Sequence, residues 1–111
     1  MKTVLFAFVS LLLSFNGCKK TDESKVPDCL SSRISTFAGY ACDSGATVKS
    51  YTFQNHTVYA FDPGNCGADM TTEVVDHSCK TLGNLGGIMG NTRINGEDFS
   101  NAVFIEQVWS N

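Results

Sequence analysis

The residues of this sequence with the clearest chemistry are its five cysteines, Cys18, Cys29, Cys42, Cys66 and Cys79. A thiol can form a disulfide in an oxidising compartment, bind zinc together with histidine, or carry a covalently attached lipid. Five is an odd number, and an unpaired cysteine in an exported protein needs a separate role. For an exported chain, the cysteine count therefore predicts two disulfides and one cysteine with a different function.

Cys18 directly follows a segment with the features of an export signal. Lys2 provides one positive charge, and residues 4–13 are apolar except for one serine. About ten apolar residues are too few to span roughly 30 Å of hydrocarbon as a helix, but they match the core of a signal peptide. The run Phe15–Cys18 resembles the bacterial lipobox, whose cysteine receives a diacylglycerol group, although the lipobox prefers leucine where this chain has phenylalanine. We therefore expect residues 1–17 to be a lipoprotein signal peptide and Cys18 to carry a lipid anchor with acyl chains such as palmitate.

Length and charge limit the protein to one small acidic domain. Removing residues 1–17 from the 111-residue chain leaves 94 residues, which is enough for one domain and not for two. The formal net charge is −3, and it becomes −4 without Lys2, the single charge of the predicted signal. Such a chain has no basic stripe to neutralise phosphates, which argues against nucleic acid or anionic headgroups as partners. We expect the polar residues 18–28 to form a flexible tether and residues 29–111 to form the folded domain.

Two sets of side chains have the chemistry to bind a metal ion. The zinc set comprises His56, His77, Cys66 and Cys79, and the calcium set comprises Asp62, Asp69 and Asp76. In an oxidising compartment the cysteines are expected in disulfides instead. The aspartates are spaced by seven residues, unlike the ligands of an EF-hand loop, and loop aspartates commonly make turns. The sequence therefore predicts no metal site.

The sequence also contains no recognisable catalytic motif. The glycine-rich run Gly83–Gly90 lacks the flanking strand and helix of a dinucleotide site and the lysine of a P-loop. No nucleophile-elbow pattern surrounds a serine. The acid pair Glu97 and Asp98 follows the turn residues Asn95–Gly96 and is expected to be solvated. Four larger aromatic residues are candidates for a ligand-binding face but are expected mostly in the core, namely Tyr40, Tyr51, Tyr59 and Trp109.

One helix and several strands must position these residues. Leu30, Ile34, Phe37 and Ala41 recur at helical spacing, which predicts an amphipathic helix over residues 29–41 with Asp28 as its N-cap. Strands are predicted over residues 48–54, 57–61, 71–75, 79–82 and 102–109, with Tyr51 and Phe53 facing the core. For residues 102–109 the periodicity allows a strand or a C-terminal helix, and the β-branched and aromatic content favours the strand.

The predicted helix limits the disulfide pairing. At about 1.5 Å per residue it would hold Cys29 and Cys42 roughly 20 Å apart, whereas bonded cysteines have Cα atoms roughly 4.4–6.8 Å apart. Cys29–Cys42 is thereby excluded from the three connectivities, and with it Cys66–Cys79. In a meander the second strand ends near the helix C-terminus, beside Cys66. The third strand returns toward the helix start, where Cys79 follows. The predicted pairs are Cys29–Cys79 and Cys42–Cys66.

These patterns together resemble a known type of domain. They combine the four cysteines and the helix with Val48-x-x-Tyr51-x-Phe53, Val58-Tyr59-x-Phe61, Asp76-x-x-Cys79, Leu85-Gly86-Gly87-Ile88-x-Gly90 and Trp109. From about residue 27 to the C-terminus, the chain resembles a family of small, uncharacterised, disulfide-bonded lipoprotein domains of Gram-negative bacteria. That resemblance implies no activity and no catalytic residue. A helix followed by antiparallel strands is also similar to PepSY-like and β-lactamase-inhibitor-like folds, a likeness that does not define function.

The sequence thus predicts an α+β domain in which one N-terminal amphipathic helix packs on an antiparallel meander of four to five strands, held by two disulfides. We expect it in the bacterial cell envelope, anchored through Cys18 on the periplasmic or surface side of the outer membrane. The missing catalytic constellation favours a non-enzymatic binding or interaction module with an envelope protein as partner and without a cofactor. An enzyme with an unrecognised active site is the alternative.

Overall fold

A computed structural model describes residues 26–111 of the chain. The predicted signal peptide, the lipid-attachment residue Cys18 and most of the predicted tether lie outside the described residues. No helix in the described part of the chain is long and apolar enough to cross a membrane.

Helix α1 (Asp28–Ala38) is the first element and is shorter than predicted. Its N-cap is Pro27, whose extended backbone precedes the helix, and Asp28 is the first helical residue instead of the cap. An acidic residue in this turn still complements the positive end of the helix dipole. The helix ends before Gly39, which is the C-cap, so the predicted extension to residue 41 is wrong. Glycine lowers helix propensity by about 1 kcal/mol relative to alanine, which favours an end at this point.

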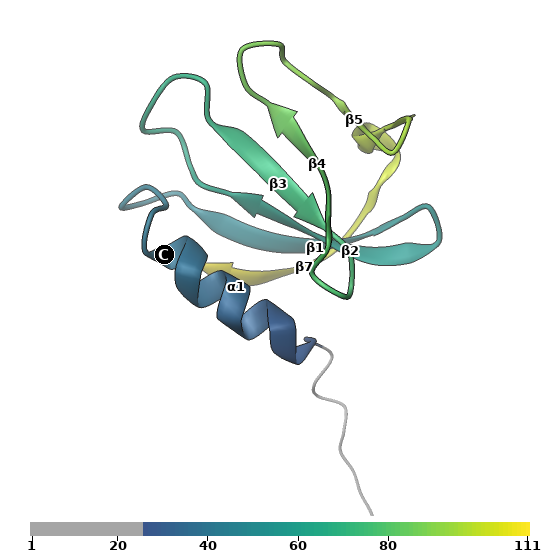
Figure 1. Ribbon diagram of the computed structural model, residues 1–111, viewed down its shortest axis with the longest axis horizontal. Coiled ribbons are helices and arrows are strands. Elements are labelled where there is room, and N and C mark those ends of the chain that lie inside the picture. Colours follow the sequence, from purple (N-terminus) through teal and green to yellow (C-terminus); the bar gives the residue numbers. More distant parts are fainter. Residues whose placement is uncertain (1–25) are drawn as a thin grey trace, which may run out of the picture.

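Five strands form one antiparallel sheet behind this helix (Figure 1). They are β1 (Thr47–Phe53), β2 (His56–Asp62), β3 (Thr71–Val75), β4 (Thr81–Gly86) and β7 (Val103–Ser110). A two-stranded ribbon of β5 (Arg93–Ile94) and β6 (Glu97–Asp98) and the 3-10 helix η2 (Phe99–Asn101) precede β7. One helix, a five-stranded antiparallel sheet and two disulfides confirm this part of the predicted fold class.

The order of the strands in the sheet is β4-β3-β2-β1-β7. The first four strands follow one another as a meander, but β7 returns across the domain to pair with β1. The predicted meander order is therefore wrong for the last strand, although residues 103–110 are a strand and not a helix. Local sequence patterns do not specify this pairing, because its partners are more than fifty residues apart along the chain.

The helix covers one face of the sheet and forms the first of two hydrophobic clusters with it. Leu30 and Phe37 from α1 pack against Val48, Tyr59 and Phe61 from β1 and β2. Phe37 makes edge-on contacts with the rings of Phe61 at 5.2 Å and of Trp109 at 5.7 Å. Alternate residues of β1 and β2 therefore supply this face, as the period of a strand requires.

The opposite face of the sheet is covered by the segment that contains β5, β6 and η2. Ile94, which is 1% exposed, packs with Phe53, Val58 and Val74 in the second hydrophobic cluster. A Cβ atom at Gly83 would lie 3.0 Å from the terminal methyl of Ile94, so any side chain at this position would require Ile94 to shift. The predicted fourth strand over residues 79–82 is misplaced, because β4 continues through this glycine to Gly86.

Two disulfides tie α1 and the following loop to the sheet. Cys29 is bonded to Cys79, and Cys42 is bonded to Cys66, which are the pairs expected from the sequence. Cys79 lies in the turn between β3 and β4 and has a positive φ of 65°. The first bond therefore joins the beginning of α1 to this turn, and the second joins the α1–β1 loop to the β2–β3 loop.

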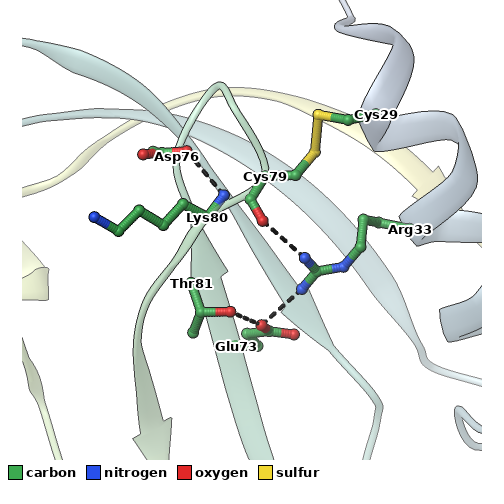
Figure 2. Close-up of polar contacts among 7 residues, drawn as sticks. All are labelled: Cys29, Arg33, Glu73, Asp76, Cys79, Lys80 and Thr81. Carbon is green, nitrogen blue, oxygen red and sulfur yellow. Dashed lines mark hydrogen bonds and ion pairs between the residues drawn. A yellow bond between two sulfur atoms is a disulfide. The ribbon is translucent and has the colours of Figure 1, made fainter.

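A salt bridge lies beside the first disulfide (Figure 2). Arg33 donates to the carbonyl oxygen of Cys79 at 2.8 Å and to the carboxylate of Glu73 at 2.7 Å, and Thr81 donates to the same carboxylate. Partial burial raises the pKa of Glu73, but hydrogen bonds from Thr81 and Arg33 outweigh burial and leave this pKa below its ordinary value. The helix is thus joined to β3 and β4 by a covalent bond and an ionic contact.

Candidate functional site

The outer edge of β7 is the largest apolar feature left uncovered on a strand in the described residues. Val103, Phe104 and Ile105 are 64%, 54% and 46% exposed. We call these three side chains the β7 patch. Three consecutive exposed apolar residues on a sheet edge are unusual, because proteins commonly protect edge strands with charges, proline or covering segments.

The pairing of β7 with β1 places the patch on both sides of the sheet edge. Val103 pairs with Thr52, and Phe104 pairs with Tyr51, whose ring lies 5.8 Å from the Phe104 ring. Register shifts on either side of the Lys49–Ser50 segment insert one extra β7 residue each. Such bulges interrupt the regular backbone ladder and leave only short stretches of it open to a partner strand.

A hollow of about 330 Å³ adjoins the patch on the sheet face that carries α1. We call it the helix-side hollow. Its lining comprises Val26, Ser50, Thr57, Tyr59, His77, Ile105 and Glu106. Ile105 belongs both to this hollow and to the β7 patch, so the two features form one continuous surface.

A second hollow, of about 480 Å³, lies between the β1–β2 turn and the β3–β4 turn. His56 and His77 both line it. The side chains of Gln54 and Asn95 hydrogen-bond to each other at 3.4 Å, which joins the β1–β2 turn to the turn between β5 and β6. The structure thus brings together at one cavity the two histidines that were considered for zinc. Cys66 and Cys79, which were considered with them, do not line this cavity.

The residues considered for metal binding do not come together. Cys66 and Cys79 belong to different disulfides. Asp62 and Asp69 line one polar hollow of about 550 Å³, whereas Asp76 accepts backbone hydrogen bonds within the β3–β4 turn. Within residues 26–111 there is no group of three or more side chains that could hold a metal ion.

The acid pair has structural partners. Glu97 accepts hydrogen bonds from the side chains of Gln54 and Asn101. Asp98 caps η2 by accepting from the backbone of Ser100, and this hydrogen bond lowers the pKa of Asp98. Both carboxylates therefore stabilise the segment that covers the second face of the sheet.

The four aromatic candidates are dispersed over the domain. Tyr59 is buried under α1 and Trp109 is half-buried beside it, whereas Tyr51 packs on Phe99 at the opposite face. Tyr40 is 64% exposed at the end of α1. These side chains do not form a shared ligand-binding face.

Ser50 is the one buried polar residue of the described core, at 3% exposure. Its hydroxyl donates to the main-chain carbonyl of Glu106 at 3.3 Å and not to an imidazole. A serine nucleophile is activated by an adjacent base that accepts its proton, so this geometry does not support nucleophilic catalysis. No observation in the described residues favours the enzyme alternative.

Sequence reasoning missed the β7 patch and the residues of the helix-side hollow. The signal was the run of apolar residues from Ala102 onward, which indicates a strand but not which of its side chains remain exposed. From the sequence, only Tyr51 and Phe53 of this strand are assigned to the core, and the alternation of a strand then places Ser50 on the opposite face. The sheet has hydrophobic clusters on both faces, so Val48 and Ser50 are buried on one face and Tyr51 and Phe53 are half-buried or buried on the other.

The fold and surface of the described residues define a small, disulfide-bonded α+β domain in which residues 26–111 leave one apolar sheet edge uncovered. Residues 38–111 match the family described as Domain of unknown function (DUF6970), and the chain belongs to this family. The match begins at the last residue of α1 and includes every strand. No curated protein and no solved structure gave a significant match to the chain.

Proposed function

We propose that this chain is a lipid-anchored protein of the bacterial cell envelope that acts as a non-enzymatic interaction module. Its binding surface is the β7 patch, and its partner is an extended segment of another envelope protein. The single observation that carries this role is the exposure of Val103, Phe104 and Ile105 on an uncovered sheet edge.

A protein segment fits this edge better than a bilayer or a second copy. An edge strand presents backbone N–H and C=O groups, which a polypeptide can pair with and hydrocarbon cannot. The described residues carry four lysines and arginines against nine aspartates and glutamates, so two copies would repel each other. The two register shifts limit backbone pairing to a short segment, whose side chains would then cover the patch.

The proposed location is supported by the roles of the five cysteines. Two disulfides within a small domain are typical of an oxidising compartment. The lipobox-like run ending at Cys18 supplies an anchor and uses the fifth cysteine. Replacing Cys18→Ser should release the protein into the soluble fraction or leave it unprocessed. A Cys18→Ser protein that still partitions into detergent with unchanged mobility would contradict the anchor.

Photo-crosslinking in intact envelopes tests the binding surface. A photoreactive phenylalanine analogue in place of Phe104 should give one discrete adduct, and Ile105→Asp should abolish it. The same analogue in place of Ile88 is the matched control, because this residue is apolar and 81% exposed near the opposite sheet edge. Equal adducts from both positions, or none from Phe104, would show that β7 is not the binding surface.

A further inference from the structure

The helix-side hollow contains two buried hydroxyl groups beside the β7 patch. Ser50 and Tyr59 are each 3% exposed and both line the hollow. The Ser50 hydroxyl uses its proton on the Glu106 carbonyl and keeps its acceptor lone pairs. The Tyr59 hydroxyl makes no hydrogen bond to the part of the chain that the structure describes. A buried hydroxyl without a partner costs about 1–3 kcal/mol, so this group needs water or a ligand in the hollow as its hydrogen-bond partner.

The charge around this hollow favours a cation as that partner. Glu106 lines the hollow and forms no salt bridge within the described residues, where the one ion pair joins Arg33 to Glu73. Burial raises the pKa of Tyr59, and the negative charge of Glu106 adds to this rise. A carboxylate and two hydroxyl oxygens are acceptors, and a lysine ammonium carries three donors on a compact group.

Apolar walls complete the match to a lysine side chain. Val26 and Ile105 line the hollow, and they can contact the aliphatic stem of a lysine while its ammonium reaches the acceptors. In an extended segment, side chains two residues apart lie roughly 6.5 Å apart on the same side. One short segment can therefore place a lysine in the hollow and an apolar residue on the adjoining patch.

We propose that the helix-side hollow receives a lysine side chain from the same extended segment that covers the β7 patch. This assignment rests on the proposed interaction role and names the residue by which the module distinguishes its partner. The apolar patch supplies contact area, and Glu106 with the hydroxyls of Ser50 and Tyr59 selects a basic residue next to it.

Defined peptides test the assignment by nuclear magnetic resonance. The protein is the full chain carrying Cys18→Ser and labelled with ¹⁵N. The probe is a blocked seven-residue peptide of alternating threonine and valine with a central lysine, and its counterparts carry norleucine or glutamate at the centre. The lysine peptide should shift the amide signals of Ser50, Tyr59 and Glu106 and bind roughly threefold to fivefold more tightly than the norleucine peptide, as expected for one exposed charge pair.

Substitutions separate the charge from general packing. Glu106→Gln should remove the preference for lysine over norleucine while leaving the norleucine peptide's affinity unchanged. Glu97→Gln is the matched control, because this carboxylate lies on β6, away from the hollow, and should leave the preference intact. Retention of the preference in Glu106→Gln would overturn the assignment.

The remaining outcomes are also decisive. Equal binding of all three peptides at β7 would overturn the lysine assignment and leave the interaction role standing. Signals of the hollow that move with protein concentration alone, or on Lys25→Gln without peptide, would assign the hollow to a second copy or to the chain's own lysine. No shift with any peptide would overturn the assignment, whereas failure of the interaction role would appear separately as absence of the Phe104 crosslink in envelopes.

Discussion

The two edges of the five-stranded sheet are finished in different ways. At the β4 edge, the backbone of Asn91 exchanges hydrogen bonds with Gly86, and its side chain donates to the carbonyl of Asn84 at 2.6 Å. At the β7 edge, Val103 and Phe104 are more than half exposed. Residues 26–111 thus satisfy one edge of the sheet and leave the other edge open, apolar and interrupted by bulges.

This difference extends to how each edge is attached to the helix. The β4 side is joined to α1 through Cys29–Cys79 and through the contact of Arg33 with Glu73. The β7 side contacts α1 through the packing of Trp109 on Phe37. We infer that the β4 side maintains the fold and that the open part of β7 is free for binding. The following predictions test this division, in order of decreasing effect on stability.

Among changes at the two edges of the sheet, the largest expected effect comes from breaking the covalent link at the β4 side. Replacing Cys29→Ser and Cys79→Ser together should lower the free energy of unfolding by about 4 kcal/mol, because this bond spans 50 residues and restricts the unfolded chain. Replacing Cys42→Ser and Cys66→Ser, with a separation of 24, should cost about 3 kcal/mol. Urea unfolding measures both values. A smaller loss for the longer loop would contradict the larger contribution assigned to the Cys29–Cys79 bond.

A somewhat smaller effect is expected from the segment that covers the second face. Ile94→Ala should lower the free energy of unfolding by about 3 kcal/mol, because it removes a side chain that is 1% exposed and leaves a cavity above Gly83. Ile88→Ala is the matched control, since its side chain is 81% exposed, and it should change stability by less than about 0.5 kcal/mol. Similar losses from the two variants would mean that the covering segment does not pack as described.

The ionic contact at the β4 side should contribute less, and its contribution should depend on pH. Because the folded state lowers the pKa of Glu73, the stabilisation is fully present above the ordinary glutamate pKa of about 4.3 and is lost as pH falls through the lower folded value. Glu73→Gln should cost about 1 kcal/mol at neutral pH, since both side chains are about a third exposed, and the difference from the unmodified chain should shrink below about pH 4. Thermal unfolding from pH 7 to pH 3 measures it, with Asp43→Asn on the exposed α1–β1 loop as control. A cost that stays constant with pH would exclude the ionic origin.

The sequence could predict much of what holds the β4 side together. The spacing of Leu30, Ile34 and Phe37 indicates a helix, and the length of that helix restricts the pairing of the cysteines. These are local or covalent constraints. The predicted bounds of α1 and β4 are less accurate. Gly39 ends the helix because glycine has a low helix propensity, and the strand continues through Gly83, whose missing side chain leaves room for Ile94.

The β7 side could not be predicted in the same way. A run of apolar residues indicates burial, but Val103 to Ile105 remain exposed because β7 pairs with β1 on one side only. That pairing, and the cover over the second face, depend on contacts between residues far apart in the chain. The candidate surface therefore emerges from the long-range topology, and Glu106 gains its place beside Ser50 from the same register.

The smallest expected effect on stability is at β7, where the largest effect on binding should occur. Phe104→Thr should change the free energy of unfolding by less than about 1 kcal/mol, because the side chain is 54% exposed and threonine suits a strand. The same change should abolish the crosslinked adduct formed from a photoreactive group in place of Val103, because the aromatic contact area for the partner is lost. Phe53→Ala gives the opposite profile, since this phenylalanine is 3% exposed in the second cluster and its loss should cost about 3–5 kcal/mol. Urea unfolding and crosslinking of the same variants separate the two roles. A Phe104→Thr protein that unfolds as easily as Phe53→Ala would show that β7 is part of the structural core, and the contrast between the two edges would then carry no functional meaning.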